Sequence, residues 1–469
     1  MLARAMDANV TRTRAACDKL SAAMLDALGA VRERTARDEL PLFSLLQATP
    51  LQLQASHLSL QEYFAARDLC DQGSLPANAF PWEWTAWWAN ALTLGTEMGG
   101  PFVRGLLRAA GVTGDALDLS QRLGGDAPTV MRVMVLFGTV LDTLELRGNA
   151  VDAEGAQTIA RALASGASAL SRLSLEKTSI GSEGAHAIAV AVQASESRLR
   201  KLNLDGYELD LPPLKGIEPV EALNLSQRHL GVASAIIIAH CLERNPRLIA
   251  LNLSSNTVGD EGASVLGQSL RANHTLRELQ LEFCGVGTGG GKGLLAALAQ
   301  RAAPLSTLNL SRNLLGPEAI SDGLREGRAS FGLLDLSHNY LSGVGARAIA
   351  QAMTTGVLET ISLNLAKNSL RDYGAKAVIN SLTGSQAAPV ELDLSLNHVG
   401  PEGGLVVARA LTEGVGSIRL HKLNLMGNSI GARSEQAIRA SALGYDQLEL
   451  LLSEPPLRGS GLNYSPTRV

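Results

Sequence analysis

The segment LDTLELRGN, residues 141–149, decides the fold, because similar segments recur along most of the chain. Its leucines and its final asparagine follow the pattern L-x-x-L-x-L-x-x-(N/C). With the last position taken as a marker, eleven copies can be placed, mostly 26 to 31 residues apart with one step of 21. The markers are Asn149, Thr178, Tyr207, Arg228, Asn256, Cys284, Asn313, Asn339, Asn368, Asn397 and Asn428. A period of this length predicts an array of stacked coils.

Each copy predicts one short strand followed by one helix. Aliphatic residues stand five and three positions before every marker, as Leu144 and Leu146 do in the first copy. Alternate residues of a strand share a face, so both leucines should point inward. The asparagine amide can then satisfy backbone groups of neighbouring coils. Apolar residues spaced by three and four predict the helices, as in 155–163, 184–192, 262–270 and 345–353.

This pattern resembles the ribonuclease-inhibitor-like class of leucine-rich repeats from Leu141 to about Leu452. The resemblance implies an α/β fold, a horseshoe of about eleven repeats over residues 136–452 with parallel strands inside and helices outside. Leu448–Leu452 are expected to form a last capping strand. The Pro-, Gly- and Ser-rich residues 453–469 are expected to be a disordered tail.

One repeat departs from the pattern. Only 21 residues separate Tyr207 from Arg228, and Pro212, Pro213 and Pro219 are expected to exclude a helix there. The outer helix should therefore be missing. Two interpretations stay open: a degenerate coil, or a notch where a partner or another domain docks.

Composition excludes several classes of protein. The formal charge of −4 offers no basic field for a nucleic acid backbone. There is no run of 18 apolar residues, so no membrane span is expected. The four cysteines lie far apart without a CxxC pair, which favours reduced thiols in a cytoplasmic protein. They are Cys17, Cys70, Cys241 and Cys284.

Residues 1–135 lack the period and contain all four tryptophans, Trp82, Trp84, Trp87 and Trp88, which predicts a separate helical domain. The string HLSLQEYFAA at 57–66, after the alternating LQLQAS at 51–56, resembles the end of the winged-helix part of NOD-like receptors and related NACHT-type NTPases. No Gly-rich loop ending in Lys-Ser/Thr precedes His57. The chain is therefore expected to be either a C-terminal fragment of such a receptor or a relative without the NTPase.

No cofactor, metal or catalytic residue is predicted. The string GTGGGKG at 287–293 resembles a phosphate loop, but Val286 replaces its first glycine and Gly293 replaces its Ser/Thr. Repeat register assigns the string to an outer turn. The eight histidines form no catalytic motif, although His338 could pair with Asp335 on the surface. We expect a binding protein rather than an enzyme.

Candidate binding residues follow from the register. The position four before each marker should face the inner side of the horseshoe and is polar in all eleven copies, which is consistent with a simple solvated ladder. The next exposed positions vary in charge and size, which is how a fixed scaffold acquires specificity. The predicted protein-binding residues are Arg147, Glu176, Lys177, Asp205, Glu282, Phe283, Arg312, Asp335, His338, Lys367, Leu396 and Met426.

Three functions remain open from the sequence. The resemblance favours a sensor or scaffold of the NOD-like-receptor type, whose inner face binds a protein and whose N-terminal domain could self-associate. The alternatives are an inhibitor that wraps its partner, as ribonuclease inhibitor does, and a GTPase-activating protein. The same kind of repeat serves all three, and no activating residue of the last can be matched here.

Overall fold

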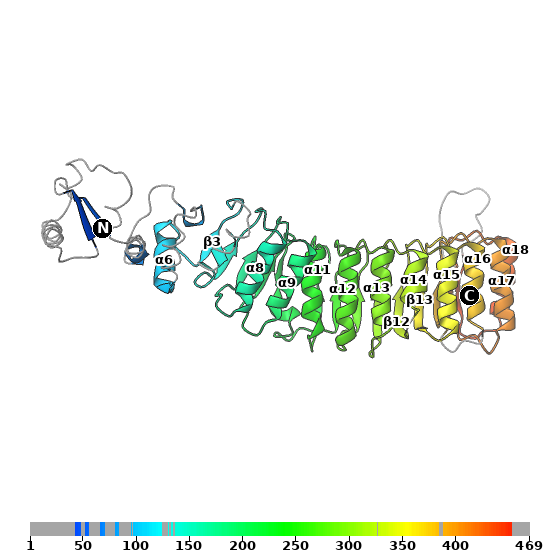
Figure 1. Ribbon diagram of the computed structural model, residues 1–469. Coiled ribbons are helices and arrows are strands. Elements are labelled where there is room, and N and C mark those ends of the chain that lie inside the picture. Colours follow the sequence, from blue (N-terminus) through cyan, green and yellow to red (C-terminus); the bar gives the residue numbers. More distant parts are fainter. Residues whose placement is uncertain are drawn as a thin grey trace.

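The computed structural model describes residues 43–47, 52–55, 66–70, 80–83, 95, 97–123, 130, 133–134, 137–325, 327–383 and 388–452. From Ala116 onward, short parallel strands alternate with helices, and the helices stand side by side along one face of an elongated array (Figure 1). Each strand leucine lies between the strand layer and the helix layer. This confirms an α/β repeat fold of stacked coils.

The strands of the array are β3 (Ala116–Asp118), β4 (Thr143–Glu145), β5 (Arg172–Ser174), β6 (Lys201–Asn203), β7 (Glu208–Asp210), β8 (Ala222–Asn224), β9 (Ala250–Asn252), β10 (Glu278–Gln280), β11 (Leu305–Asn309), β12 (Ala329–Asp335), β13 (Leu358–Asn364), β14 (Glu391–Asp393), β15 (Lys422–Asn424) and β16 (Glu449–Leu451). The helices are α6 (Gly100–Ala109), α8 (Ala153–Ala164), α9 (Gly181–Gln193), α10 (Leu211–Leu214), α11 (Val232–Glu243), α12 (Gly259–Ala272), α13 (Thr288–Leu298), α14 (Pro317–Gly323), α15 (Ser342–Thr354), α16 (Arg371–Ser381), α17 (Pro401–Glu413) and α18 (Ala432–Ala442). The four helices predicted by range lie within α8, α9, α12 and α15.

The sheet begins before the first predicted repeat and ends at the predicted capping strand. β3 pairs in parallel with β4, so the array begins one coil earlier than the repeat pattern indicated. In this coil Gly114 replaces the first leucine of the pattern and Arg122 stands at the marker position, so the match is poor. At the other end β16 pairs in parallel with β15, which confirms the last strand predicted within Leu448–Leu452.

The short repeat interrupts the sheet. β7 turns back and pairs antiparallel with β6, and β8 begins a second sheet that continues to β16. Leu223 of β8 is only half-buried, whereas the equivalent leucines of its neighbours, such as Leu202 and Leu251, are fully buried. The outer helix of this repeat is missing, as predicted. The helices on either side of it, α9 and α11, lie against each other, and His186 Nδ1 is 3.0 Å from His240 Nε2.

One part of the prediction for this repeat was wrong. Leu211–Leu214 form a single helical turn, α10, although the prolines were expected to exclude a helix. Pro212 and Pro213 stand at the start of that turn, where a backbone N–H needs no partner within the helix. Proline prevents the helix from being longer, but it is compatible with one turn.

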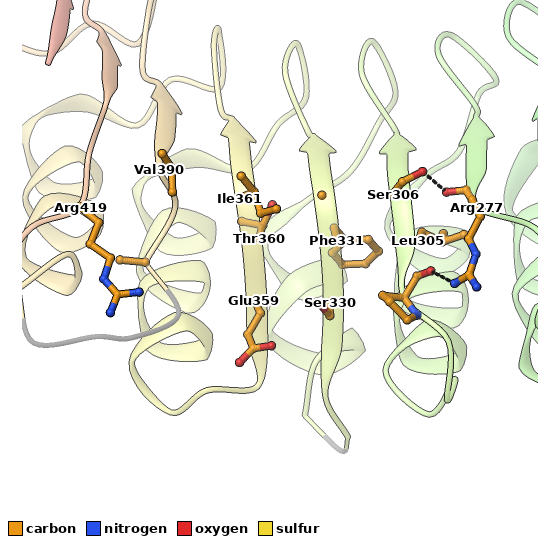
Figure 2. Close-up of a pocket in the computed structure, with 13 residues that line it drawn as sticks. Arg277, Leu305, Ser306, Ser330, Phe331, Glu359, Thr360, Ile361, Val390 and Arg419 are labelled. Carbon is orange, nitrogen blue, oxygen red and sulfur yellow. Dashed lines mark hydrogen bonds between the residues drawn. The ribbon is translucent and has the colours of Figure 1, made fainter. Parts of the chain in front are cut away.

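Three strands of the second sheet are longer than the rest. β11 has 5 residues and β12 and β13 have 7 each, while their neighbours β10 and β14 have 3. The extra residues lie at the amino ends of the strands, as Figure 2 shows for Ser306, Phe331 and Thr360. The sheet therefore has an extended lip on one edge.

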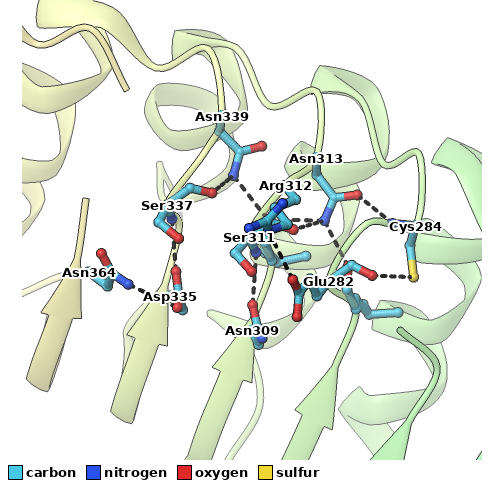
Figure 3. A network of polar contacts seen from close by, with 12 residues as sticks. Glu282, Cys284, Asn309, Ser311, Arg312, Asn313, Asp335, Ser337, Asn339 and Asn364 are labelled. Carbon is cyan, nitrogen blue, oxygen red and sulfur yellow. Dashed lines mark hydrogen bonds and ion pairs between the residues drawn. The ribbon is translucent and has the colours of Figure 1, made fainter. Parts of the chain in front are cut away.

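The asparagine ladder expected from the markers is present. Asn313 is 2% exposed and donates from Nδ2 to the carbonyls of Leu281 and Leu310 at 2.7 and 3.0 Å. Its Oδ1 accepts the backbone N–H groups of Cys284 and Val286, both at 3.0 Å. Figure 3 shows this arrangement repeated in the next coil. Each amide thus joins its own coil to the one before it.

A second ladder, not expected from the sequence, runs along the carboxyl ends of three outer helices. Asn245 and Asn273 donate from Nδ2 to carbonyls of the preceding coil, including those of Leu214 and Leu242, at 2.8 and 2.7 Å. In the next coil Arg301 replaces asparagine. Its guanidinium donates to carbonyl oxygens at 2.5 to 3.0 Å, and the residue is only 7% exposed. Burial lowers the pKa of Arg301 to about 10, which leaves the group charged at neutral pH.

The described N-terminal residues are continuous with the array. Ala66, Leu69, Trp82 and Phe102 join the same buried core as the repeat leucines, so the core runs without interruption across residue 135. β1 (Phe43–Gln47) pairs antiparallel with β2 (Gln52–Ala55). The alternating segment LQLQAS at 51–56 therefore contains a strand, as expected. Residues 57–65, Trp84, Trp87, Trp88, Cys17 and the tail 453–469 lie outside the described residues.

Among the described cysteines, Cys241 and Cys284 are free thiols. Among the described helices none combines the length and the apolar character that a bilayer crossing requires. Burial raises the pKa of Cys241 to about 12 and that of Cys284 to about 11. A thiol in the unfolded chain ionises at about 8.5.

Stability is therefore expected to fall as pH rises above about 8.5, because the unfolded chain then releases two protons that the folded chain retains. At a pH about one unit above that value, each thiol should account for a loss of about 1.4 kcal/mol. Urea unfolding of the parent chain and of a Cys241→Ala/Cys284→Ala variant, each at several pH values, isolates this contribution. Equal pH dependence in the two proteins would contradict it.

Candidate functional site

The position directly before each marker has an unusual backbone. From β3 to β15 every one of these residues has a positive φ, between 52° and 96°. Left-handed backbone favours glycine, yet glycine occurs there only in the coils of β4, β6 and β15. The others are Gln121, Lys177, Gln227, Ser255, Phe283, Arg312, His338, Lys367 and Leu396. Large side chains are thus held in a conformation that they rarely adopt.

Five of these side chains form a row on five consecutive coils, from the coil of β10 to that of β14. We call this row the strand-end ridge, and it consists of Phe283, Arg312, His338, Lys367 and Leu396. Phe283 is 65% exposed and Leu396 is 49% exposed. Neighbouring strands lie about 4.8 Å apart, so the ridge spans about 19 Å. It presents an apolar group at each end with basic groups between them.

The centre of the ridge is held by a network of charges. Arg312 Nε lies 3.1 Å from Glu282 Oε1, as Figure 3 shows. Burial, together with Lys367 and Arg312, lowers the pKa of His338. Its imidazole is therefore neutral at neutral pH, and it can donate one hydrogen bond and accept another.

The other predicted binding residues do not join this row. Arg147 and Lys177 both contact Glu176, at 3.3 and 3.8 Å, in the first sheet. Asp205 accepts the backbone N–H of Gly231 at 2.8 Å and so caps the start of α11 across the interrupted sheet. Met426 is half-buried in the coil of β15. We therefore treat Asp205 as a structural residue and centre the candidate surface on the ridge.

The polar row four positions before the markers has a local structural role. Asp335 Oδ1 accepts the backbone N–H of Ser337 at 2.9 Å, and Asp335 Oδ2 accepts Asn364 Nδ2 at 3.0 Å. Asn309 accepts the N–H of Ser311 in the same way (Figure 3). Turns of this kind in the coils of β11 to β14 fix the direction of the residues that follow them, which include four of the five ridge residues.

The glycine-rich string 287–293 forms the start of α13 on the outer side. Asp260 Oδ1 accepts the backbone N–H of Gly287 at 2.5 Å, and a Cβ at Gly290 would lie 2.6 Å from the Cα of Asp260. A carboxylate of the chain itself thus occupies the end of the helix where a phosphate would bind. The glycines allow the close approach of α12 and α13.

A second surface, which the sequence analysis missed, lies at the opposite edge of the strands. A hollow of about 530 Å³ follows the amino ends of β11, β12 and β13, with Phe331 and Ile361 along it and Arg277 and Arg419 at its ends (Figure 2). A smaller hollow of about 460 Å³ shares Arg277 and continues toward β8. We call the two together the amino-end groove.

Comparison with known proteins agrees with the coil geometry. A family model described as Leucine Rich repeat matches residues 139–160, 244–267, 272–295, 333–350 and 390–408. The chain carries leucine-rich repeats. A search of the curated proteins found no match. Repeats of this kind commonly act as protein-interaction scaffolds and are typically not enzymes.

The leucine-rich repeats explain why one surface was predicted and the other was not. Ridge residues stand beside a marker, so the repeat register alone locates them. The groove depends on Arg277 and Arg419, which stand at different positions relative to their markers. Only the extra length of β12 and β13 brings the intervening residues together. The sequence does contain a signal for the longer strands: apolar segments such as ASFGL at 329–333 extend each strand toward its amino end.

Proposed function

We propose that this chain is a protein-binding scaffold or sensor that holds its partner along the strand-end ridge. One observation carries the proposal: five large side chains in succession keep a left-handed backbone, and all of them except half-buried His338 are exposed to solvent. A left-handed conformation costs about 1 to 2 kcal/mol for a residue other than glycine. Exposed Phe283 and Leu396 do not recover that cost by burial within the chain. Binding a partner would recover it.

The ridge can be tested without damage to the fold. Glycine is the residue that best accepts a left-handed backbone, so Phe283→Gly and Leu396→Gly remove side chains with little strain. Their unfolding free energies should stay within about 1 kcal/mol of the parent value. Affinity for a ridge-bound protein should fall roughly tenfold or more, as is usual for an exposed aromatic anchor.

The measurement is affinity capture from the source cells with the parent chain and the double glycine variant, followed by affinity titration of each captured protein. Ser255→Gly is the matched control, because Ser255 has the same backbone conformation, with φ of 60°, and only a small side chain. Proteins that bind the parent and the control but not the double variant support the ridge. If all three chains capture the same proteins with equal affinity, the ridge is not the binding surface.

At a finer level we propose a receptor of the NOD-like type, with the ribonuclease-inhibitor-like form of the repeat and a cytoplasmic location. The antiparallel pair β1 and β2 directly before the string at 57–66 supports this, since a wing of two strands stands there in the family that the string resembles. Sequencing the transcript upstream of Met1 tests it. A Gly-rich loop ending in Gly-Lys-Ser/Thr upstream would support the proposal, and a stop codon with no such loop would favour a free-standing binding protein.

A further inference from the structure

The amino-end groove contains basic side chains that lack acidic partners. Along most of the strand side, arginines and lysines are paired: Arg172 with Glu208 at 3.1 Å and Arg200 with Glu218 at 3.1 Å are examples. Arg277 and Arg419 have no carboxylate within 4.0 Å in the described part of the chain, although both are exposed. The carboxylate that lies between them, on Glu359, is already paired with Arg328.

Arg277 is held in place by its neighbours. Its guanidinium Nη1 donates to the carbonyl of Pro304 at 3.2 Å, and its own carbonyl accepts Ser306 Oγ at 2.9 Å (Figure 2). One bond from a group with five donors leaves most of them available to a ligand. A guanidinium so oriented suits bidentate recognition of a carboxylate.

Apolar residues make up most of the lining between the two arginines, together with Glu359 and three hydroxyl side chains. Ile361 on β13 is 62% exposed at the middle of the groove, and Phe331 on the neighbouring strand β12 is buried. Gly332 also lines the groove and lies close to β11, because a Cβ there would be 2.5 Å from the carbonyl oxygen of Ser306. An exposed isoleucine beside a hollow favours an apolar side chain of a partner.

The dimensions fit an extended peptide. Arg277 precedes β10 and Arg419 precedes β15, five strands further along the sheet. Five interstrand spacings amount to about 24 Å, which an extended chain covers with about seven residues. A peptide that crosses the strands could therefore place one acidic residue on each arginine and an apolar residue over Ile361.

We propose that the amino-end groove binds an extended acidic segment of a partner protein, with carboxylates at Arg277 and Arg419 and an apolar side chain at Ile361. This inference rests on the proposed function, since it names the chemistry of a bound partner. It concerns a different edge of the strands from the ridge. Arg247 and half-exposed Ile249 line the continuation of the groove toward β8, where Glu221 is the one acidic residue of the lining.

The experiment is selection of a random peptide library displayed on phage against the parent chain, with depletion against an Arg277→Glu/Arg419→Glu variant. Enriched peptides are then synthesised with a fluorophore and titrated by anisotropy. They should carry Asp or Glu on both sides of an apolar residue. Their affinity should fall roughly ten- to a hundredfold in the charge-reversal variant, and by about tenfold in Ile361→Asp.

Matched controls separate the possible outcomes. Arg347→Glu reverses an exposed charge on α15, on the helix side, and should leave peptide affinity unchanged. Phe283→Gly should also leave it unchanged, so loss of the ridge function would not affect this result. Circular dichroism establishes that each variant is folded.

Three results would overturn the proposal: no enriched peptide, enriched peptides without acidic residues, or equal affinity in the parent and the charge-reversal variant. A random RNA oligonucleotide serves as a second anionic probe. Binding of this RNA that depends on Arg277 and Arg419, in the absence of peptide binding, would assign the groove to nucleic acid instead.

Discussion

Replacing Arg301 with methionine is expected to lower the free energy of unfolding by about 4 kcal/mol. Methionine fills most of the space but donates no hydrogen bond. The carbonyls of Leu270, Asn273 and Leu276, which now accept Arg301 at 2.7 to 3.0 Å, would then be buried without a donor. Each such group costs about 1 to 3 kcal/mol. Urea denaturation followed by circular dichroism measures the change.

Two control variants test whether these hydrogen bonds are the cause. Arg325→Met removes an exposed arginine and should change stability by no more than about 0.5 kcal/mol. Arg301→Asn introduces the residue that the two preceding coils have at this position, Asn245 and Asn273. It should therefore lower the free energy of unfolding less than Arg301→Met does. Because coils contact only their neighbours, hydrogen exchange should increase first in α12 and α13. Similar losses for Arg301→Met and Arg325→Met would show that the ladder contributes little.

Replacing Asn313 with alanine is expected to lower the free energy of unfolding by about 3 kcal/mol. This residue satisfies carbonyls of its own coil and the preceding one, and also accepts the N–H groups of Cys284 and Val286. Alanine leaves these buried groups unpaired and also leaves a small cavity. Urea denaturation again provides the measurement, with hydrogen exchange at the N–H of Val286 as the local readout.

The matched control is Asn309→Ala, at the end of the strand in the same coil. Asn309 accepts one backbone N–H, that of Ser311, in a half-exposed turn, so its loss should cost about 1 kcal/mol. The opposite change, Cys284→Asn, adds an amide where Sγ now makes a weak hydrogen bond to the carbonyl of Leu253 at 3.2 Å. It should raise the free energy of unfolding by about 1 kcal/mol. If Asn313→Ala and Asn309→Ala lower the free energy of unfolding equally, the asparagine ladder does not make the contribution expected here.

The repeat, the inner position of its leucines and the role of its asparagines could all be predicted from the amino-acid sequence. These follow from spacing alone, because a strand alternates its faces every second residue and each coil repeats the contacts of the last. The missing outer helix near Pro212 was predictable for the same reason. The ridge positions could also be located, since they stand beside a marker.

Which of those positions share a surface could not be predicted in this way, because it depends on contacts between coils. Asp205 looks like its counterparts in the sequence, yet it caps α11 because the interrupted sheet brings that helix close. In the sequence Arg301 resembles an ordinary surface arginine, yet it is buried and donates hydrogen bonds to carbonyl groups of two coils. The amino-end groove likewise depends on residues up to five coils apart. Such sites arise from contacts between coils, and the spacing within one repeat carries no record of them.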